Sequence, residues 1–434
     1  MKKVLIITYY WPPSGGAGVQ RWLKFVKYLR EFNWEPVVYT PLNPETPATD
    51  NSLSNEIPAG LTVLQTKVWE PFTLYKAFTG RKKSEKIQTA FLSEDKKPGL
   101  TEKISIWIRG NFFIPDARKF WIKPSVSYLS AWVKDHPVDL IISTGPPHSM
   151  HMIALGLKHK TGLPWLADFR DPWTEIDFYH ELQLTALADK KHHALEKMVL
   201  STADRVSVIS QGMAKQFNLI HPASYAVITN GFDESDYHAA TPVRQSSFAL
   251  AHIGSLVKTR NPQVLWKALS LLCDEVDGFS ADLEIRLIGK TDQFVVEAIE
   301  TAGLLANMNK IDYLTHDLVG QEQQQANVLL LLINNTPNAK LILTGKLFEY
   351  MQSGRPILCI GPVDGDAASV LEETGTGKCI DFEDVLSAKA YILSAYKQFK
   401  AGIIDGNKAD ISKYTRRSLT GQLASLLNEL LTEQ

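Results

Sequence analysis

The stretch Thr344-Gly-Lys-Leu-Phe-Glu-Tyr-Met-Gln-Ser-Gly-Arg-Pro356 decides how the second half of this 434-residue chain folds. It lies between two apolar runs, 328–333 and 356–360, that we expect to form buried strands. Residues 346–351 predict a short helix that Gly354 ends. A strand–loop–helix unit directs the N-terminus of its helix toward the end of the strand, where free backbone N–H groups favour an anion.

Lys346 and Glu349 place opposite charges on one face of this helix, because they stand three residues apart. A cation beside a carboxylate suits a ligand with both phosphate and hydroxyl groups, such as a nucleotide-sugar. An ordinary surface ion pair is the alternative for this spacing.

Length and composition indicate a globular protein of two or three domains. The chain is 44% hydrophobic and 21% charged, and its formal net charge of −1 gives no electrostatic argument for a nucleic-acid partner. Cys273, Cys359 and Cys379 stand far apart, which provides neither a disulfide framework nor metal-ligand spacing. A reducing cytoplasm is therefore the expected location. We expect no transmembrane helix, because no apolar run reaches about 18 residues, and a membrane role would be peripheral.

The first half begins with a strand, a glycine-rich loop and a helix. The strand at 4–8 and the helix at 19–32 flank a loop that holds Gly15, Gly16 and Gly18. This loop matches neither the dinucleotide fingerprint nor a Walker A loop. Its glycines would let backbone amides approach a phosphate or a sugar. A tight turn is the alternative.

Polar loops follow the predicted strands at 139–143 and 164–167. Ligands of open α/β sheets bind at the carboxyl ends of the strands, so these loops are candidates for a site. They contribute four candidates for catalysis, namely His148, Asp168, Arg170 and Asp171. His148 is a candidate base or acceptor contact, and the three charged residues are candidates to hold sugar hydroxyls. An Arg–Asp pair that only orders the loop is the alternative.

Two segments interrupt the alternation of strands and helices. Residues 79–103 carry a run of mixed charge, which predicts an insertion or a mobile loop. Residues 107–123 mix aromatic and basic side chains, which is typical of a membrane interface. An irregular core segment under the sheet is the alternative for the second segment.

The chain divides near residues 234–247, which are polar and lack periodicity. We predict an N-terminal Rossmann-like domain at 1–235 and a C-terminal one at 245–405 that restarts the same alternation. A last amphipathic helix within 406–434 has no following strand and is expected to pack across the hinge.

Other motifs fall short of a metal or phosphate site. Asp364-Gly-Asp366 has no second cluster of ligands, and Thr374-Gly-Thr-Gly-Lys378 lacks the Ser or Thr that would hold Mg²⁺. The pair His192 and His193 lacks a His-Glu-x-x-His frame. We therefore expect no metal and no other cofactor.

Six motifs, taken in their order and spacing, resemble glycosyltransferases of family 4, also called group 1, with the GT-B fold. They are Gly15–Gly18, Ser143–Ser149, Asp168–Trp173, Asn230–Asp233, Gly254–Leu256 and Lys346–Tyr350. The resemblance implies an α/β fold of two Rossmann-like domains facing across a cleft. It also implies a nucleotide-diphospho-sugar donor on the C-terminal domain and an acceptor, a saccharide or a lipid-linked one, on the N-terminal domain. Retaining transfer is the activity it suggests, and the lack of a metal motif predicts that no metal takes part. The aromatic and basic stretch 107–123 points to the synthesis of cell-envelope polysaccharide or glycolipid.

The same resemblance implies which residues bind the donor. Glu349 falls where the family's glutamate contacts the ribose, Arg260 falls where a lysine contacts the diphosphate, and Gly254 opens that phosphate loop. The predicted donor-binding residues are Gly15, Gly16, Gly18, Asn230, Gly254, Ser255, Lys258, Arg260, Lys346 and Glu349.

Two departures from the family pattern keep other functions open. The first glutamate of the family's Glu-x7-Glu is replaced by Leu341, and the usual Gly-Arg-Leu has become Gly254-Ser255-Leu256. Lys258 and Lys346 would supply the lost positive charge. A GT-B nucleotide-sugar epimerase and a non-catalytic nucleotide-sugar-binding protein are the alternatives to a transferase.

Overall fold

The computed structural model describes residues 1–46, 49–70, 100–177, 179–236, 246–311, 314, 316–403 and 409–433. The chain forms two compact units. The first contains residues 1–93, 98–229 and 416–434, and the second consists chiefly of residues 230–415. Most of the predicted insertion at 79–103 and of the predicted boundary at 234–247 lies outside the described residues.

A seven-stranded parallel sheet forms the centre of the first unit, in the order β3-β2-β1-β4-β5-β6-β7. Its strands are β1 (Lys2–Ile7), β2 (Trp34–Pro41), β3 (Thr62–Thr66), β4 (Leu140–Gly145), β5 (Trp165–Phe169), β6 (Arg205–Val208) and β7 (Tyr225–Val227). The central strands are continuous apolar runs because helices cover both faces of the sheet. Leu5 and Ile7 thus enter one core cluster and Val4 and Ile6 the other.

The helices of the first unit divide between the two faces of this sheet. They are α1 (Ala17–Leu29), α3 (Leu100–Phe112), α4 (Lys119–Asp135), α5 (Ser149–Thr161), α6 (Ala186–Thr202), α7 (Gln211–Ile220) and α15 (Arg416–Thr432). Short 3-10 helices are η1 (Arg30–Phe32), η2 (Ser52–Glu56) and η3 (Tyr179–Leu182). Helices α4, α5, α6 and α7 share one core cluster, and α1 and α15 share the other.

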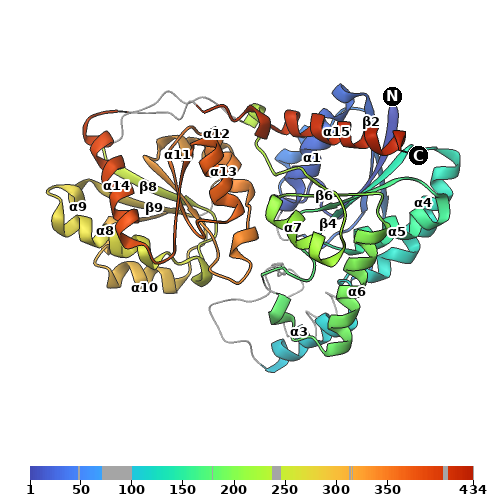
Figure 1. Cartoon of the computed structure of the whole chain (residues 1–434), viewed down its shortest axis with the longest axis horizontal. Helices are drawn as coiled ribbons and strands as arrows, with labels where there is room; N and C mark the ends of the chain where they lie inside the picture. The colour runs from blue at the N-terminus through green and yellow to red at the C-terminus, as the bar shows by residue number, and fades with distance from the viewer. Residues whose placement is uncertain are drawn as a thin grey trace. The chain divides into compact units, whose positions relative to one another are not determined.

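The last helix of the chain belongs to the first unit. It begins at Arg416 and lies along α1 (Figure 1). Leu419, Leu423 and Leu427 enter the same core cluster as Trp22, because their spacing of four residues places them on one helix face. The C-terminus therefore completes the core that the N-terminal residues begin.

The second unit repeats the architecture with six parallel strands in the order β10-β9-β8-β11-β12-β13. Its strands are β8 (Phe248–Ile253), β9 (Leu283–Ile288), β10 (Met308–Ile311), β11 (Val328–Leu332), β12 (Ile357–Ile360) and β13 (Gly377–Ile380). Its helices are α8 (Gln263–Glu275), α9 (Phe279–Asp282), α10 (Gln293–Thr301), α11 (His316–Gln325), α12 (Gly345–Gln352), α13 (Asp366–Thr374) and α14 (Val385–Lys400). The 3-10 helices are η4 (Glu234–Asp236), η5 (Lys258–Arg260), η6 (Leu305–Asn307), η7 (Ala339–Leu341) and η8 (Ser412–Tyr414). The predicted α/β class, with two Rossmann-like units, is confirmed.

Each sheet has a point where the strand order reverses, and this point positions the candidate sites. The reversal lies between β1 and β4 in the first unit and between β8 and β11 in the second. Loops that leave two such strands diverge, which opens a crevice at their carboxyl ends. In the first unit these loops carry Gly16 and His148. In the second unit they carry Gly254 and lead to Lys346.

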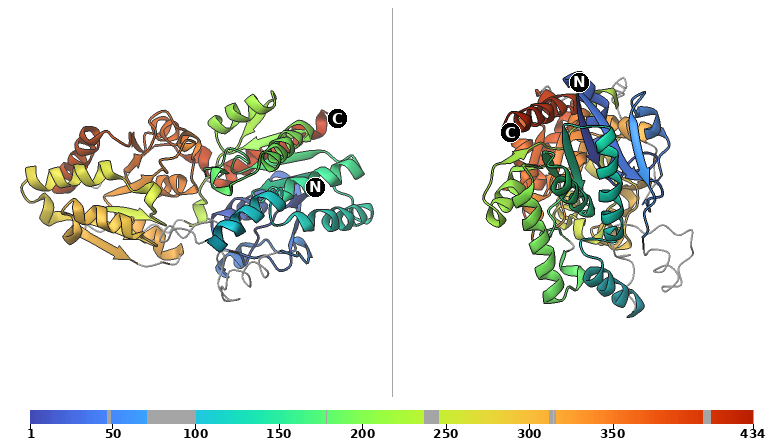
Figure 2. Two further views of the ribbon diagram at one scale, coloured as in Figure 1. Left: turned by 90° about the horizontal axis from the view of Figure 1, so that it is seen from below. Right: turned by 90° about the vertical axis from the view of Figure 1, so that its right-hand side faces the viewer.

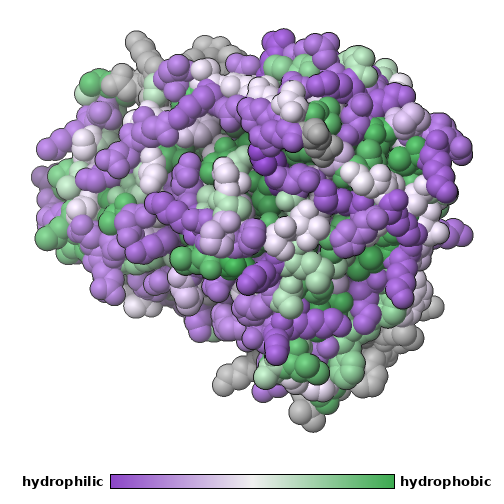
Figure 3. Space-filling model, turned by 45° about the vertical axis from the view of Figure 1, so that its right-hand side comes forward, coloured by the Kyte–Doolittle hydropathy of each residue, from purple (hydrophilic) through white to green (hydrophobic). Residues whose placement is uncertain are grey.

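The aromatic and basic segment 107–123 forms the end of α3 and the start of α4, with a non-helical connection at 113–118 between them, and Trp121 of α4 enters the core. Helix α3 lies away from the sheet beside α6 (Figures 1 and 2). Ile104, Trp107, Ile108 and Phe112 on α3 are 38–59% exposed. Hydrophobic side chains are visible at the lower end of the molecule in Figure 3, where Figure 1 places α3.

None of the helices in the described part of the chain is long and apolar enough to cross a bilayer.

The cysteines are not all far apart in space. Cys359 and Cys379 stand opposite each other on β12 and β13, and both are free thiols. The neighbouring Cys379 thiol raises the pKa of Cys359, and burial acts in the same direction. The parallel pairing of the two strands, which no spacing in the sequence reveals, brings them together.

Candidate functional site

Asp168 is the best-connected polar group in the described part of the first unit. Its carboxylate is buried at the end of β5 and accepts five hydrogen bonds. The donors are Arg21 Nη2 (2.9 Å) and Nε (3.3 Å), Trp22 Nε1 (2.8 Å), Thr144 Oγ1 (2.9 Å) and Ser207 Oγ (2.9 Å). Burial by itself raises the pKa of Asp168, but the Arg21 charge and these donors outweigh it, so the pKa is lowered. With its lone pairs occupied, this carboxylate serves as a structural anchor. The geometry favours the structural alternative over a direct role in catalysis.

The expected pair of an arginine with an aspartate exists, but its arginine is Arg21 rather than Arg170. Arg21 is 2% exposed, and it also donates to the backbone carbonyls of Ile228 (2.9 Å) and Thr229 (2.7 Å). Its guanidinium is therefore engaged by hydrogen bonds inside the first unit.

Arg170 orders the glycine-rich loop. Its guanidinium donates to the backbone carbonyl of Gly18 at 2.9 Å and to that of Pro146. A Cβ on Gly18 would come 2.9 Å from the Tyr10 ring and 3.2 Å from the Arg170 guanidinium, so the close packing requires glycine there. Gly16 has a positive φ of 96° at the N-cap of α1, which explains the need for a second glycine. Gly15, in the same loop, is buried.

His148 lies at the N-cap of α5, immediately after the loop that follows β4. Its ring stacks on Trp173 with a centroid distance of 4.4 Å, and its Nδ1 is buried with no hydrogen-bond partner among the described residues. Burial lowers the pKa of His148 well below its usual range, and the neighbouring His151 acts in the same direction. A neutral imidazole can accept a proton, as a general base must.

Asp171 has the opposite character from Asp168. Its side chain is exposed, and no hydrogen bond or ion pair joins it to another described residue. Desolvation by the surrounding protein atoms raises the pKa of Asp171 to about 6, although the nearby Arg170 charge opposes the shift. Among the four candidates for catalysis, His148 and Asp171 are thus the two with unoccupied acceptor atoms.

His148 and Asp171 line the same cavity, which we call the α3 pocket. It encloses about 320 Å³ and lies wholly within the first unit. Its other walls include Tyr10, Phe113, Trp173 and Ile176. Sequence reasoning missed this pocket because its walls come from α3, the loops after β1, β4 and β5, and the start of α6. The signal available was the concentration of aromatic residues in 107–123 and 169–179.

In the second unit, the predicted donor residues meet at the carboxyl end of β8. Gly254 has a positive φ of 122°, and a Cβ there would lie 2.3 Å from Lys346 Nζ. Lys346 stands in the first turn of α12, so the loop after β8 and the N-terminus of α12 enclose its ammonium group. Burial and the Arg260 charge lower the pKa of Lys346 to about 8, while Glu349 opposes the shift. A crowded cation beside free helix N–H groups is a site for an anion.

A side chain of helix α12 forms a hydrogen bond with the backbone of β8. The Tyr350 hydroxyl accepts the backbone N–H of Ile253 at 3.1 Å, and Tyr350 is fully buried. His252 is buried on β8 and contacts the carbonyl of Leu330 at 3.1 Å through Nδ1. Burial and the Lys346 charge lower the pKa of His252 to about 3. The cations of this edge therefore face a neutral histidine.

The other predicted donor residues of the second unit differ in their surroundings. Arg260 donates to Asn334 Oδ1 and to the carbonyl of Ser255 (3.4 Å), which closes the loop after β8. Lys258 is exposed and lies over the Phe294 ring at 4.8 Å. Ser255 is exposed, whereas Glu349 on α12 and Asn230 after β7 are partly buried.

Leu341, which stands where the family has a glutamate, lies in η7 ahead of α12. It is partly buried and brings no charge to the edge. Asp364, the first residue of the Asp-x-Asp motif, pairs with the exposed Lys340 at 2.5 Å.

The second unit also has a cavity of about 450 Å³ at the carboxyl ends of β11 and β12. Thr259, Arg260, Lys267 and Asn335 line it, but Lys346 and Glu349 do not. Arg260 is thus shared between this cavity and the cluster around Lys346. The position of Lys346 combines a cation, a glycine and a helix N-terminus.

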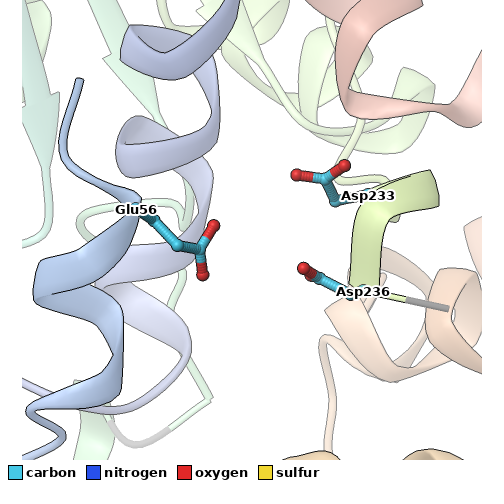
Figure 4. A group of neighbouring side chains, drawn as sticks. All are labelled: Glu56, Asp233 and Asp236. Carbon is cyan, nitrogen blue, oxygen red and sulfur yellow. The ribbon is translucent and has the colours of Figure 1, made fainter. Parts of the chain in front are cut away.

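Figure 4 draws three further carboxylates, those of Glu56, Asp233 and Asp236. Glu56 of η2 pairs with Lys24 at 2.5 Å. Asp233 accepts the Ser235 hydroxyl at 2.9 Å, and the backbone N–H of Asp236 donates to its carbonyl at 3.0 Å. Asp233 thereby stabilises the turn that begins η4.

Comparison with known proteins bears on both units. Residues 87–236 match the family model described as Glycosyltransferase Family 4. No curated protein matches the sequence.

Solved structures with this architecture cover the whole chain. Sucrose-phosphate synthase from Thermosynechococcus elongatus superposes with a TM-score of 0.64 at 14% identity, over 100% of both chains. HepE from Anabaena, in complex with UDP-glucose, gives a TM-score of 0.61 at 14% identity, over 99% of this chain and 100% of its own. S. aureus TarM, as a mutant in complex with Fondaparinux, alpha-GlcNAc-glycerol and UDP, gives 0.61 at 11%, over 99% and 100%. At such identities the likeness concerns the fold.

If Asp168 anchors the first unit, its replacement by alanine should lower the stability of the fold. We expect Asp168→Ala to cost about 3–5 kcal/mol, because it leaves the Arg21 guanidinium buried and unpaired. Urea denaturation at pH 7.5, followed by tryptophan fluorescence, measures this loss.

Asp171→Asn is the matched control. A folded-state pKa of about 6 for Asp171 lies above the ordinary value of about 3.9, so ionisation of Asp171 destabilises the folded state as pH rises. The control should therefore keep or gain stability at pH 7.5. Equal losses in both variants would remove the anchoring role of Asp168.

Proposed function

We propose that this chain, a GT-B-fold glycosyltransferase with a family 4 domain at residues 87–236, moves a sugar from a nucleotide-diphospho-sugar to an acceptor hydroxyl. The observation that carries the proposal is the Lys346 ammonium enclosed by Gly254 and the N-terminus of α12. A diphosphate placed there would meet a cation and free backbone N–H groups together. Glu349, one turn further along α12, would then receive the ribose hydroxyls.

The proposed chemistry concerns the charge that develops on the donor. As the anomeric bond breaks, positive charge grows on the sugar ring and negative charge on the diphosphate. Lys346, Arg260, Lys258 and the N–H groups of α12 would stabilise the leaving diphosphate. We propose that these groups replace a metal ion in this role, and that transfer retains the anomeric configuration. The departing diphosphate and the incoming hydroxyl would then share one face of the sugar.

The first unit would supply the acceptor site. His148 and Asp171 both line the α3 pocket, and the Asp171 carboxylate has no hydrogen-bond or ion-pair partner among the described residues. Asp171 is the better candidate to take the proton of the acceptor hydroxyl, because its pKa is near neutrality at about 6, whereas burial lowers the pKa of His148 and makes it a weaker base. Arg170 and Asp168 would act only by holding the surrounding loops.

The outer face of α3 supports a peripheral contact with a membrane. Trp107 and Phe112 are exposed on it, and their rings lie 5.8 Å apart. Lys119 lies within 5.6 Å of the Phe113 and Phe120 rings, near the charge of Lys191. Exposed aromatic rings beside lysines suit the interface of an anionic leaflet. We therefore propose a cytoplasmic enzyme that acts at the inner face of a membrane, in the synthesis of cell-envelope polysaccharide or glycolipid.

The alternatives differ in what happens to the donor. A nucleotide-sugar epimerase would change the donor with no acceptor present, and a non-catalytic protein would only bind it. Leu341 and Ser255, which stand where the family has a glutamate and an arginine, favour the second alternative.

Incubation with radiolabelled UDP-, GDP- and ADP-sugars, with and without EDTA, separates these functions. Free sugars and a lipid-linked sugar in anionic phospholipid vesicles serve as acceptors. We expect nucleotide release that requires an acceptor and survives EDTA, and a product whose anomeric configuration by NMR equals that of the donor. An epimerised donor without acceptor, or tight binding with neither outcome, would replace the proposal by the matching alternative.

The transfer assay with the vesicle-borne acceptor is repeated with the double variant Trp107→Ser and Phe112→Ser. It should lose transfer to the vesicle-borne acceptor and retain transfer to a soluble one. Equal transfer to the vesicle-borne acceptor by both proteins would contradict the membrane contact.

Glu349→Ala should weaken binding of a ribonucleoside diphosphate. A hydrogen bond from a hydroxyl to a charged group contributes about 1.5–3 kcal/mol, or roughly 10- to 150-fold in Kd. The 2′-deoxy analogue should lose much less than the ribonucleotide on this substitution. The exposed Glu372 of α13 provides the control Glu372→Ala, which should leave both affinities unchanged. Equal losses for the ribo and deoxy ligands would remove the ribose assignment.

Donor affinity should also fall as pH rises through the pKa of Lys346, which is about 8. Below pH 8 the ammonium is charged and binds the diphosphate. Above it, deprotonation should weaken binding by up to about tenfold per pH unit. Titration calorimetry with UDP and GDP from pH 6.5 to 9 measures this slope. Lys346→Met should flatten it, whereas Lys340→Met, in the exposed pair with Asp364, should not. A flat profile in the wild type would exclude Lys346 as the diphosphate contact.

A further inference from the structure

The α3 pocket has a chemical character that narrows the class of acceptor. Its walls are largely apolar and aromatic, with Phe113, Trp173, Ile176 and Leu182 among them. A volume of about 320 Å³ lies at the small end of ligand sites. The pocket lies beneath α3, because Arg109 and Gly110 of that helix line it while Trp107 and Ile108 are exposed.

Its aromatic wall is fixed before any ligand arrives. The Trp173 indole N–H donates to His192 Nδ1 at 3.0 Å, and its backbone N–H donates to Glu196 Oε1 at 3.0 Å. Its ring stacks on His148 with an angle of 2° between the planes. A wall held in this way needs little ordering when a flat or apolar group binds.

Most charged groups of the lining already have partners. Asp116 accepts the backbone N–H and the hydroxyl of Ser149, both at 2.8 Å, and thereby caps α5. Arg118 pairs with Glu70 at 2.9 Å and lies over the Tyr9 ring at 4.4 Å. Arg109 has interactions of its own. The pocket thus offers no uncommitted cation for a phosphate among its described lining residues.

Few polar groups remain open to a ligand among the described lining residues. The Asp171 carboxylate has no hydrogen bond or ion pair, and the Tyr10 hydroxyl has no hydrogen bond to another described residue, whereas His148 Nδ1 and His192 Nε2 are unpartnered but buried. A free saccharide would bring several hydroxyl groups to walls that cannot pair them, and each buried unpaired group costs about 1–3 kcal/mol. An apolar group that carries one hydroxyl matches these walls better.

We propose that the α3 pocket binds an apolar group of the acceptor, next to the hydroxyl that receives the sugar. This inference rests on the proposed function, and it favours an acceptor with a prenyl, acyl or aryl group over a free saccharide. Trp173 and Ile176 contact the apolar group, and Asp171 receives the hydroxyl. The exposed apolar face of α3 then lies on the same element that covers this group.

Binding of three alcohols to the full-length protein tests the proposal by titration calorimetry. Geraniol carries a prenyl chain, 3-phenyl-1-propanol carries an aryl group, and glycerol carries neither. We expect at least one of the first two to bind tenfold or more tightly than glycerol. Preference for geraniol assigns a prenyl or acyl chain, and preference for phenylpropanol assigns an aryl group. Equal, weak binding of all three overturns the proposal.

Two substitutions locate the binding. Ile176→Trp fills the pocket and should weaken the preferred alcohol at least tenfold, whereas Phe113→Ala enlarges it and should change the ratio between the two apolar alcohols. Leu219→Trp, on α7 at a side chain that is 88% exposed and outside the pocket, is the matched control and should bind as the wild type does. An alcohol that binds equally to all these proteins lies elsewhere, and the proposal then fails.

Nucleoside diphosphate binding separates this failure from a failure of the proposed function. It depends on the second unit, so it should be the same in the three variants, whereas circular dichroism and tryptophan fluorescence check that the first unit of each variant is folded. Normal nucleotide binding and transfer, with no preference for the apolar alcohols, would leave the transferase intact and remove only the apolar acceptor group. Loss of nucleotide binding in the wild type would remove the proposed function itself.

Discussion

The buried ion pair of Arg21 with Asp168 is the interaction on which the first unit depends. Through it and the neighbouring donors, one carboxylate joins α1, β4, β5 and β6, and Arg21 extends the network to the carbonyls after β7. Buried charges are tolerated only when paired and hydrogen-bonded, and both partners here are 1–2% exposed. This network holds the carboxyl ends of the strands together beside the point where the strand order reverses. The loops that line the α3 pocket begin at these strand ends.

At the corresponding point of the second unit, the described contacts are of another kind. A tyrosine hydroxyl on α12 meets the backbone of β8, and a glycine at the end of β8 leaves room for Lys346. Burial and the neighbouring Arg260 charge lower the pKa of Lys346 to about 8. A bound anion would stabilise the charged form of this lysine, which burial and Arg260 disfavour. The two units therefore differ in chemistry, one offering aromatic walls and a carboxylate and the other offering cations and N–H groups.

Much of the fold could be predicted from the sequence. The apolar runs at 248–253 and 283–288 coincide with β8 and β9, because a strand covered on both faces is a continuous apolar segment. The helix predicted at 346–351 became α12 with one more residue at each end. The short strand β10 escaped prediction, since Met308-Asn-Lys-Ile311 is largely polar and gains its conformation from pairing with β9. The segment 107–123 was harder still, because its aromatic residues serve both a core and an exposed face.

By itself the sequence determined the two α/β units, the resemblance to glycosyltransferases and the residues that stand at the ends of strands. It could do so because hydrophobic periodicity and glycine positions are local properties. The tertiary structure alone decided the roles of those residues. It paired Asp168 with Arg21 instead of Arg170, and it left Asp171 without a hydrogen bond or ion pair among the described residues. It also enclosed Lys346 against Gly254, and made one pocket from α3 and three strand ends. These outcomes depend on which groups far apart in the sequence become neighbours in the fold. The burial of each side chain and its hydrogen-bond or ion-pair partners then decide its charge and whether it can bind a ligand.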